Sequence, residues 1–216
     1  MPAFFLTGTD TEVGKTHCLC ALLWRARGRF GRVAGMKPFA SGLDAQGKNA
    51  DIEAIRAASC PPLPEAQLNL YRFAEPISPH IAAARAGTPI RFAPILAAVD
   101  TARAACDFLA IEGAGGFRIP LSDDGDSADL AQALGLPVIL AVGMRLGCIN
   151  HALLSAEAIL ARGLPLAGWI ANRIDPEMAA FTENLDSLKR LMPAPLLGVL
   201  PHGVAPEHAS AALTLP

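Results

Sequence analysis

The stretch that decides the fold is LTGTDTEVGKTHC, residues 6–18. An apolar run precedes it, and it contains a turn of mostly small residues followed by Gly14-Lys15-Thr16. This is the sequence context of a phosphate-binding loop, G-x-x-x-x-G-K-[ST]. Thr9 stands where that pattern has its first glycine, and Gly8 comes one residue earlier. A β-branched residue rarely adopts positive φ, so we expect Gly8 to supply the backbone freedom instead. The stretch predicts a phosphate loop of a particular subtype.

The residue types in this loop fit polyphosphate chemistry. Backbone N–H groups and the start of the following helix carry positive partial charge that attracts phosphate. Lys15 can add a full charge near the β- and γ-phosphates, and the Thr16 hydroxyl can ligate Mg²⁺. Asp10 and Glu12 would repel a triphosphate unless they face Mg²⁺, solvent or a cationic substrate such as an amine.

Composition bounds the class of protein. The 216 residues are 52% hydrophobic and 18% charged with a net charge of −2, which predicts one globular domain over residues 1–216 and no bias toward nucleic acid or an anionic membrane. The start, MPAFFLTGTD, has no basic region and fits a buried strand better than a signal peptide. The longest apolar runs are too short to span a bilayer. We expect a soluble, cytoplasmic protein.

Cysteine and histidine patterns argue against a disulfide framework and against a metal held by these residues. The five cysteines are an odd number without a C-x-x-C pair, and the five histidines are scattered. Cys18 and Cys20 fall in the helix expected after the phosphate loop, where packing as small hydrophobes is favoured over metal binding.

Short apolar runs alternate with stretches of helical period, which is typical of an α/β fold with a mostly parallel central sheet flanked by helices. The expected strands are 3–7, 32–37, 107–112, 137–142, 166–171 and 196–200. The expected helices are 15–28, 50–58, 79–86, 92–105, 127–134, 148–162 and 177–191. The larger aromatic residues are expected to pack in the core or against helices: Trp24, Phe30, Phe108 and Trp169.

Ligands of such sheets bind at the carboxyl ends of the strands, so polar residues there are candidates. Lys37, in GMKPFASG, should project toward the phosphates, although a solvated lysine is the alternative. Ser41 follows at the same edge. Glu112 ends an apolar strand, as a magnesium-binding acid would. Asp51 opens a helix, so it is either a further acid of the site or a helix N-cap.

Gly113-Ala114-Gly115-Gly116 also allows another interpretation. A run of glycines after a strand occurs in dinucleotide-binding folds, but Arg118 stands where their last glycine would be. The run also lies mid-chain, so we discount a dinucleotide site.

Taken together, several motifs resemble those of the dethiobiotin synthetase family of the biotin pathway. They are TGTDTEVGKT, KPFASG, EPISPH, EGAGG, GCINH and APLLG, in order from Thr7 to about Pro201. The Thr9 spacing is the one that this family and its amide-forming relatives use. The resemblance implies that 7,8-diaminopelargonate, CO₂ and ATP are joined to give dethiobiotin, ADP and phosphate, by way of a phosphorylated carbamate.

The resemblance also implies roles for individual residues. Lys15 and Lys37 would flank the carbamate and the γ-phosphate, Thr11 and Ser41 would bond phosphate and substrate, and Glu12 would suit a diamine. Mg²⁺ would be bound by Thr16, Asp51 and Glu112. The nucleotide and phosphates would contact Glu12, Val13, Gly14, Lys15, Thr16, His17, Gly113, Ala114, Gly115, Asn172, Arg173, Pro201, His202 and Gly203.

The sequence leaves two alternatives for the nucleotide base, of which adenine is favoured by the family resemblance. On family grounds Asn172 reads adenine, but NRID, residues 172–175, resembles the N-K-x-D element that reads guanine. A carboxylate at Asp175 could bond the N1–H and N2 amine of guanine.

The family is homodimeric, and the substrate carboxylate is received by a helix N-terminus of the partner subunit. Gly147 and Asn150, in RLGCINHALL, open an apolar helix that could do this. From the residues alone, Asn150 and His151 read as a helix-capping turn.

Two other classes share the loop. Cobyrinate amidating synthetases phosphorylate a carboxylate, but they carry a glutaminase domain for which we expect no room in 216 residues. Nucleotide switches of the ParA and MinD type have an extra lysine at the start of the loop, where this chain has Thr9 and Asp10. Some also have an amphipathic membrane tail, and ASAALTLP shows no basic face.

Overall fold

The computed structural model describes every residue from Met1 to Pro216 and is built on one parallel sheet. Its six strands lie in the order β10-β9-β8-β1-β5-β2, and every neighbouring pair is parallel. The strands are β1 (Ala3–Gly8), β2 (Val33–Met36), β5 (Phe108–Glu112), β8 (Val138–Gly143), β9 (Leu166–Asn172) and β10 (Leu196–Leu200). All six expected strands are confirmed, and the fold is the expected α/β type.

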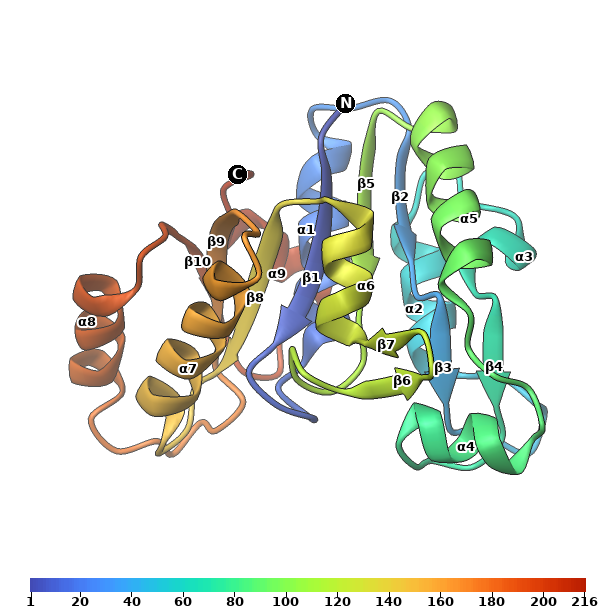
Figure 1. Cartoon of the computed structure of the whole chain (residues 1–216). Helices are drawn as coiled ribbons and strands as arrows, with labels where there is room; N and C mark the ends of the chain where they lie inside the picture. Colours follow the sequence, from blue (N-terminus) through green and yellow to red (C-terminus); the bar gives the residue numbers. More distant parts are fainter.

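Helices cover both faces of this sheet. In Figure 1, α5, α6 and α7 lie on the face toward the viewer, and α1, α2 and α9 lie behind it. The helices are α1 (Lys15–Arg27), α2 (Ala50–Ala58), α3 (Glu65–Leu68), α4 (Pro79–Arg85), α5 (Phe92–Ala105), α6 (Ser127–Leu134), α7 (Cys148–Ala161), α8 (Phe181–Leu191) and α9 (Pro206–Ala209), with a 3₁₀ turn over Ser210–Ala212. The seven expected helices are all present.

One helix boundary differs from the expectation. The helix expected from residue 177 begins only at Phe181. Asp175 Oδ1 accepts the N–H of Glu177 at 2.9 Å, which makes a local turn. Ala180 then has a left-handed φ of 53°, so the chain cannot enter a right-handed helix before it.

Four short strands and two short helices were not expected. The strands are β3 (Phe39–Ser41), β4 (Tyr71–Phe73), β6 (Pro120–Ser122) and β7 (Gly125–Asp126), and the helices are α3 and α9. The pairs β3–β4 and β6–β7 form small sheets of their own. Figure 1 places both pairs, with α4, at the end of the molecule toward which the main strands point. They enlarge the edge where a ligand site is expected.

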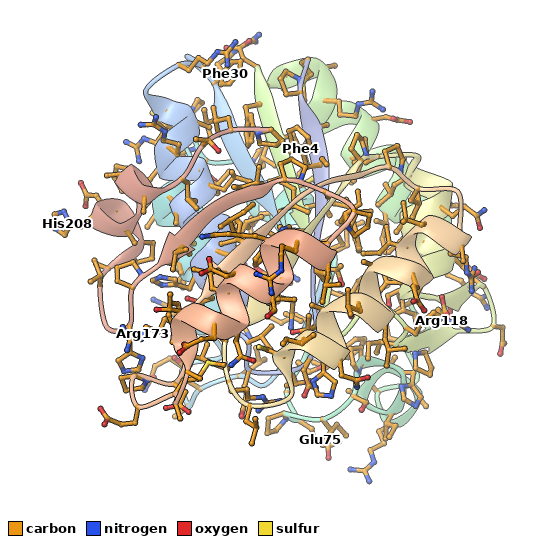
Figure 2. The ribbon with its side chains drawn as sticks, turned by 90° about the vertical axis from the view of Figure 1, so that its left-hand side faces the viewer. Phe4, Phe30, Glu75, Arg118, Arg173 and His208 are labelled. Carbon is orange, nitrogen blue, oxygen red and sulfur yellow. The ribbon has the colours of Figure 1, made fainter.

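The aromatic residues lie where the sequence predicted. Trp169 and Phe108 are fully buried, and Trp24 and Phe30 are partly buried against the core. Figure 2 shows α7 and α8 side by side in front of the sheet, with Phe4 and Phe30 toward the end opposite Arg173 and Glu75. Cys18 and Cys20 are buried in α1, as expected, and all five cysteines are free. No helix has the length and apolar character needed to cross a membrane.

Phe108 anchors the end of the core away from the ligand edge. Its ring centroid lies 5.7 Å from that of Phe4 and 5.5 Å from that of Phe30. Replacing Phe108 by alanine removes these contacts and leaves a cavity, so we expect the free energy of unfolding to fall by about 3–5 kcal/mol. Phe30→Ala, at the partly exposed rim, is the matched control and should cost clearly less. Chemical denaturation of both variants measures the difference, and equal losses would contradict this account of the core.

Candidate functional site

The phosphate loop connects β1 to α1 at the carboxyl edge of the sheet. Two of its residues have left-handed backbone, Glu12 with φ 60° and Gly14 with φ 78°, whereas Thr9 does not. The expectation of an ordinary φ at Thr9 is therefore confirmed, but the expectation that Gly8 supplies conformational freedom is wrong. Gly8 is required for space: a Cβ there would lie 2.7 Å from Val13 Cγ2 and 2.9 Å from Lys15 Cγ.

A cleft of about 910 Å³ opens beside this loop. It is large enough for a nucleotide and a second small molecule. Many of the candidate residues from the sequence line it, namely Thr11, Glu12, Gly14, Lys15, Thr16, His17, Lys37, Ser41, Asp51, Glu112, Ala114 and Gly115. The fold therefore brings together residues that are far apart in the chain.

Lys37 stands between two acids at the floor of the cleft. Its Nζ donates to Glu112 Oε1 at 2.7 Å and to Asp51 Oδ2. The side chain of Lys37 is 8% exposed and that of Glu112 is 0% exposed. Burial alone would lower the pKa of Lys37, but Glu112 and Asp51 outweigh it and raise the pKa above its ordinary value. The ammonium is therefore held in its charged form, and the solvated alternative is wrong.

Three different elements position this group. Lys37 directly follows β2, Glu112 ends β5, and these two strands are neighbours in the sheet. Asp51 comes from the first turn of α2, but it is not the N-cap, as its sequence position alone had suggested. Asn49 caps α2 by accepting the N–H of Ile52 at 3.2 Å. Asp51 is thereby free to bond Lys37.

Lys15 differs electrostatically from Lys37. Its Nζ donates to the backbone oxygen of Asp10 at 2.9 Å and makes no ion pair. Burial lowers the pKa of Lys15, and the nearby charge of Lys37 adds to this effect, although Glu112 opposes it. An anion bound beside Lys15 would favour its charged form. Lys15 is thus available to bind a negatively charged group of a ligand.

The oxygen atoms around Glu112 are of the kind that Mg²⁺ prefers. Thr16 Oγ1 donates to Glu112 Oε1 at 2.8 Å, while Glu112 Oε2 is buried without a partner. Asp51 adds a second carboxylate. No group of three or more His, Cys, Asp or Glu side chains is arranged so that it could hold a metal ion by itself. Mg²⁺ commonly binds proteins through one or two carboxylates while keeping waters and phosphate oxygens, so this donor set fits it.

The carboxylate of Asp10 is neutralised within the protein. Its Oδ2 accepts from Arg145 at 2.6 Å and its Oδ1 from the Thr11 N–H at 2.7 Å. The sequence did not lead us to predict Arg145 as a residue of the site. The signal was a basic residue two positions after a buried strand, at the same edge of the sheet as Lys37.

The rim of the cleft also has an apolar part that the sequence did not predict. It comes from the segment before and within α4 and from the loop before β6, and its residues are Pro76, Ile77, Pro79, Ile81 and Ile119. Ile81 is 41% exposed in the free protein. An aliphatic portion of a ligand could cover this surface.

Nine candidate residues do not line the cleft: Val13, Gly113, Gly147, Asn150, Asn172, Arg173, Pro201, His202 and Gly203. The interpretation of Asn150 and His151 as a capping turn is wrong, because both lie within α7 and Gly147, with φ 93°, is the N-cap. Asn172 instead braces the phosphate loop, since its Nδ2 donates to Val13 O at 2.9 Å.

The loops after β9 and β10 contact each other. The Arg173 guanidinium lies 4.9 Å from the Phe181 ring centroid and donates to Pro176 O at 2.8 Å. His202 Nδ1 lies 3.2 Å from Arg173 O. Figure 2 places Arg173 toward the ligand end of the molecule. The candidate residues of these two loops do not line the cleft.

Comparison with known proteins agrees with the site. Residues 2–205 match a family model described as AAA domain. The chain is 56% identical over 220 residues to the ATP-dependent dethiobiotin synthetase BioD of Aromatoleum aromaticum, covering 99% of this chain and 97% of that protein. It is 51% identical to the protein of the same name from Ralstonia nicotianae, covering 96% and 92%. The chain belongs to the dethiobiotin synthetase family.

A solved structure shares the fold of this dethiobiotin synthetase family member. A ParA family ATPase from Chlorobium tepidum superposes with a TM-score of 0.57 at 11% identity, covering 93% of this chain and 84% of that chain. At this identity the similarity concerns the fold alone. It confirms the expected fold class.

The pair Arg145–Asp10 generates a prediction. Arg145→Met leaves an unpaired carboxylate beside the phosphate loop, so we expect the KM for MgATP to rise about two- to fivefold, as for an exposed ion pair of up to about 1 kcal/mol. The increase should shrink at high salt, because screening weakens the repulsion. The matched control is Arg32→Met, which breaks the exposed pair with Asp107 near the start of β2. Steady-state kinetics at two ionic strengths measure both, and an unchanged KM at low salt would refute the role of Arg145.

Proposed function

We propose that this protein converts 7,8-diaminopelargonate, CO₂ and ATP into dethiobiotin, ADP and phosphate, as a cyclo-ligase of biotin biosynthesis. The observation that carries the proposal is the pair of buried lysines, Lys15 and Lys37, in one cleft beside a phosphate loop. Two cations are suited to a reaction that assembles several negative charges, a carbamate and a triphosphate, at one place. The relatives named above carry this activity in their names.

The reaction has three steps. One amine of the substrate adds to CO₂ and loses a proton, which forms a carbamate. A carbamate oxygen then attacks the γ-phosphorus, the bond to the ADP oxygen breaks, and a carbamic-phosphoric anhydride results. The second amine attacks the carbamoyl carbon, the C–O bond to phosphate breaks, the amine loses a proton to the departing phosphate, and a cyclic urea and hydrogen phosphate are formed. Phosphorylation makes a poor leaving oxygen a good one.

The protein contributes mainly position and charge. Phosphoryl transfer disperses negative charge over the equatorial oxygens, so stabilising cations placed in advance lower the barrier. Lys37 takes the carbamate side and Lys15 the γ-phosphate side, with Thr11 bonding the phosphate. Backbone N–H groups of the phosphate loop and of residues 113–115 hold the remaining oxygens.

Mg²⁺ is bound by Thr16, Asp51 and Glu112 in this proposal. The ion would neutralise phosphate charge and orient the triphosphate. The buried, unpartnered Glu112 Oε2 supports this assignment, as does the exclusive use of oxygen donors.

The diamine would occupy the side of the cleft next to α4. Glu12 carries a charge that suits an amine. The Ser41 hydroxyl is buried without a partner, which leaves it free to bond the substrate. The apolar rim of Pro76, Ile77 and Ile81 would cover the aliphatic chain of the nine-carbon substrate.

The nucleotide is ATP rather than GTP in this proposal. Asn172 uses one N–H for Val13, so its Oδ1 can accept from the exocyclic amine of adenine. Asp175 would have to read guanine with a carboxylate that already accepts the N–H of Glu177. The base would lie between His17, Asn172 and the loops that carry Arg173 and residues 201–203.

The protein acts as a cytoplasmic homodimer of single-domain subunits, with the substrate carboxylate received at Gly147 and Asn150 of the partner subunit. The start of α7 supports this arrangement. Leu146 is 91% exposed and Leu154 is 56% exposed. Exposed leucines beside a helix N-terminus suit an interface that also binds a carboxylate.

The function is tested by measuring phosphate release from MgATP with and without 7,8-diaminopelargonate and bicarbonate. We expect release to require both, and mass spectrometry to find dethiobiotin. GTP is the matched comparison for the base and should support less turnover. Phosphate release that ignores the diamine, without a cyclic urea, would refute the synthetase function.

Lys37→Gln tests the catalytic charge. The substitution removes the ammonium near the reacting carbamate but leaves the phosphate loop intact. We expect turnover to fall about 10²–10³-fold, as for the loss of one transition-state charge partner, while ATP affinity changes less than about threefold. Lys189→Gln, which removes an exposed lysine of α8, is the control. Normal turnover of Lys37→Gln would eliminate the role of this lysine.

Leu146→Glu tests the homodimer. A charge buried in the proposed interface is costly, so we expect the dimer to weaken by at least tenfold in its dissociation constant. Because the partner would complete the carboxylate site, the KM for the diamine should rise while that for ATP stays constant. Sedimentation velocity and kinetics at several protein concentrations measure this. Leu191→Glu, which changes an exposed leucine of α8, serves as control.

A further inference from the structure

Lys37 lies at a break in the main sheet. β2 ends at Met36, and the chain passes Lys37 and Pro38 before it enters β3 at Phe39. At such a break the peptide groups of Lys37 have no partner in the ladder of the main sheet. A residue whose side chain must hold one position between two acids therefore needs another backbone support.

The segment that ends α3 provides this support. The N–H of Lys37 donates to Leu68 O at 2.9 Å, and the carbonyl oxygen of Lys37 accepts from Asn69 Nδ2 at 2.7 Å. Two neighbouring residues thus fix both peptide groups of the lysine. Only one of these bonds comes from a side chain, and it is the one that depends on amino-acid identity.

Asn69 is buried, with 7% of its surface exposed, and its side-chain amide makes further hydrogen bonds besides the one to Lys37. Nδ2 also donates to Tyr71 O at 3.2 Å, and Oδ1 accepts from Arg72 Nε at 3.2 Å. The side chain joins the break after β2 to the start of β4. Neither a carboxylate nor an apolar side chain could reproduce this pattern, because it needs two donors and one acceptor.

The same connection returns to the acid that holds the ammonium. Arg72 donates to Glu65 at 2.8 Å, and Glu65 also pairs with Arg56 of α2 at 3.3 Å. α2 carries Asp51 in its first turn, and Asp51 bonds Lys37 Nζ. The backbone and the side chain of Lys37 are therefore connected through these surface contacts together with helix α2, which joins Arg56 to Asp51.

We propose that Asn69 is a positioning residue for Lys37, which sets the reach of the ammonium toward the reacting carbamate. The inference rests on the proposed function for its effect on turnover, but the placement of Lys37 can be tested without it. A misplacement of about 1 Å in a reacting group can cost about 10²-fold in rate. The Asn69 side chain makes no hydrogen bond to the phosphate loop, so we expect its loss to affect turnover more than MgATP binding.

The kinetic test uses Asn69→Ala and the isosteric Asn69→Asp. We expect kcat to fall about 10- to 100-fold in both, with the KM for MgATP within about twofold of wild type. Asn69→Asp should be at least as severe, because its carboxylate faces the carbonyl oxygens of Lys37 and Tyr71. Leu185→Ala, a core truncation in α8, controls for lost stability and should keep kcat below its Tm. Equal kcat in Asn69→Asp and wild type would overturn the proposal.

A second measurement does not depend on the reaction. Amine acetylation with an N-hydroxysuccinimide ester, followed by peptide mass spectrometry, gives the labelling rate of each lysine. Lys37 should label at least tenfold faster in Asn69→Ala than in wild type, whereas Lys15 and Lys189 should not change. An unchanged rate at Lys37 would overturn the positioning role. If wild type makes no dethiobiotin but Lys37 labelling rises in the variant, the proposed function fails and the role of Asn69 stands.

Discussion

The ion pair between Lys37 and Glu112 is the interaction on which the rest of the site depends. Both groups are almost completely buried, at 2.7 Å from Nζ to Oε1. Taking two charges out of water is costly, and the loss of either would leave the other uncompensated. The ion pair lies at the carboxyl ends of two neighbouring strands, β2 and β5, and both of its residues line the cleft. The inner end of the cleft is therefore charged and polar rather than apolar.

The parallel sheet explains why these residues meet. Its strand order puts β1, with the phosphate loop, next to β5, and β5 next to β2. The three strand ends therefore deliver Lys15, Glu112 and Lys37 to one place although about a hundred residues separate the first two. α2 closes the group from the side with Asp51. The short strands β3, β4, β6 and β7 enlarge this end of the molecule, but they form separate sheets and do not alter the strand order of the main sheet.

Much of this arrangement could be predicted from the sequence. Buried parallel strands are continuous apolar runs, and long helices repeat their apolar face, so both gave a clear signal over the main sheet. The polar residues at strand ends, such as Lys37 and Glu112, could be found by the same logic. Strands of two or three residues, such as β7, are too short to carry a pattern. The left-handed conformation fell on Glu12 rather than Gly8, because space and not torsion required the glycine.

The roles of residues that act through contacts with distant parts of the chain could not be predicted from the sequence. Arg145 and Asn69 each lie in ordinary-looking segments, and their roles depend on partners 135 and 32 residues away. No local period records such a contact. The N-cap was one of two alternatives for Asp51, and Asn49 occupies it instead, because either residue type satisfies a helix N-terminus. Only the position of α2 against Lys37 decides between them.

The two lysines of the cleft show how the protein divides charge before a ligand arrives. Lys37 already has two carboxylates, so its positive charge is stable but internally balanced, and its pKa is raised despite burial. Lys15 has only a carbonyl oxygen, and burial lowers its pKa. An incoming triphosphate therefore gains most from Lys15, since there the protein supplies no counter-charge. In the proposed reaction, Mg²⁺ held by Asp51 and Glu112 would engage these two carboxylates, which would leave the ammonium of Lys37 free for the carbamate.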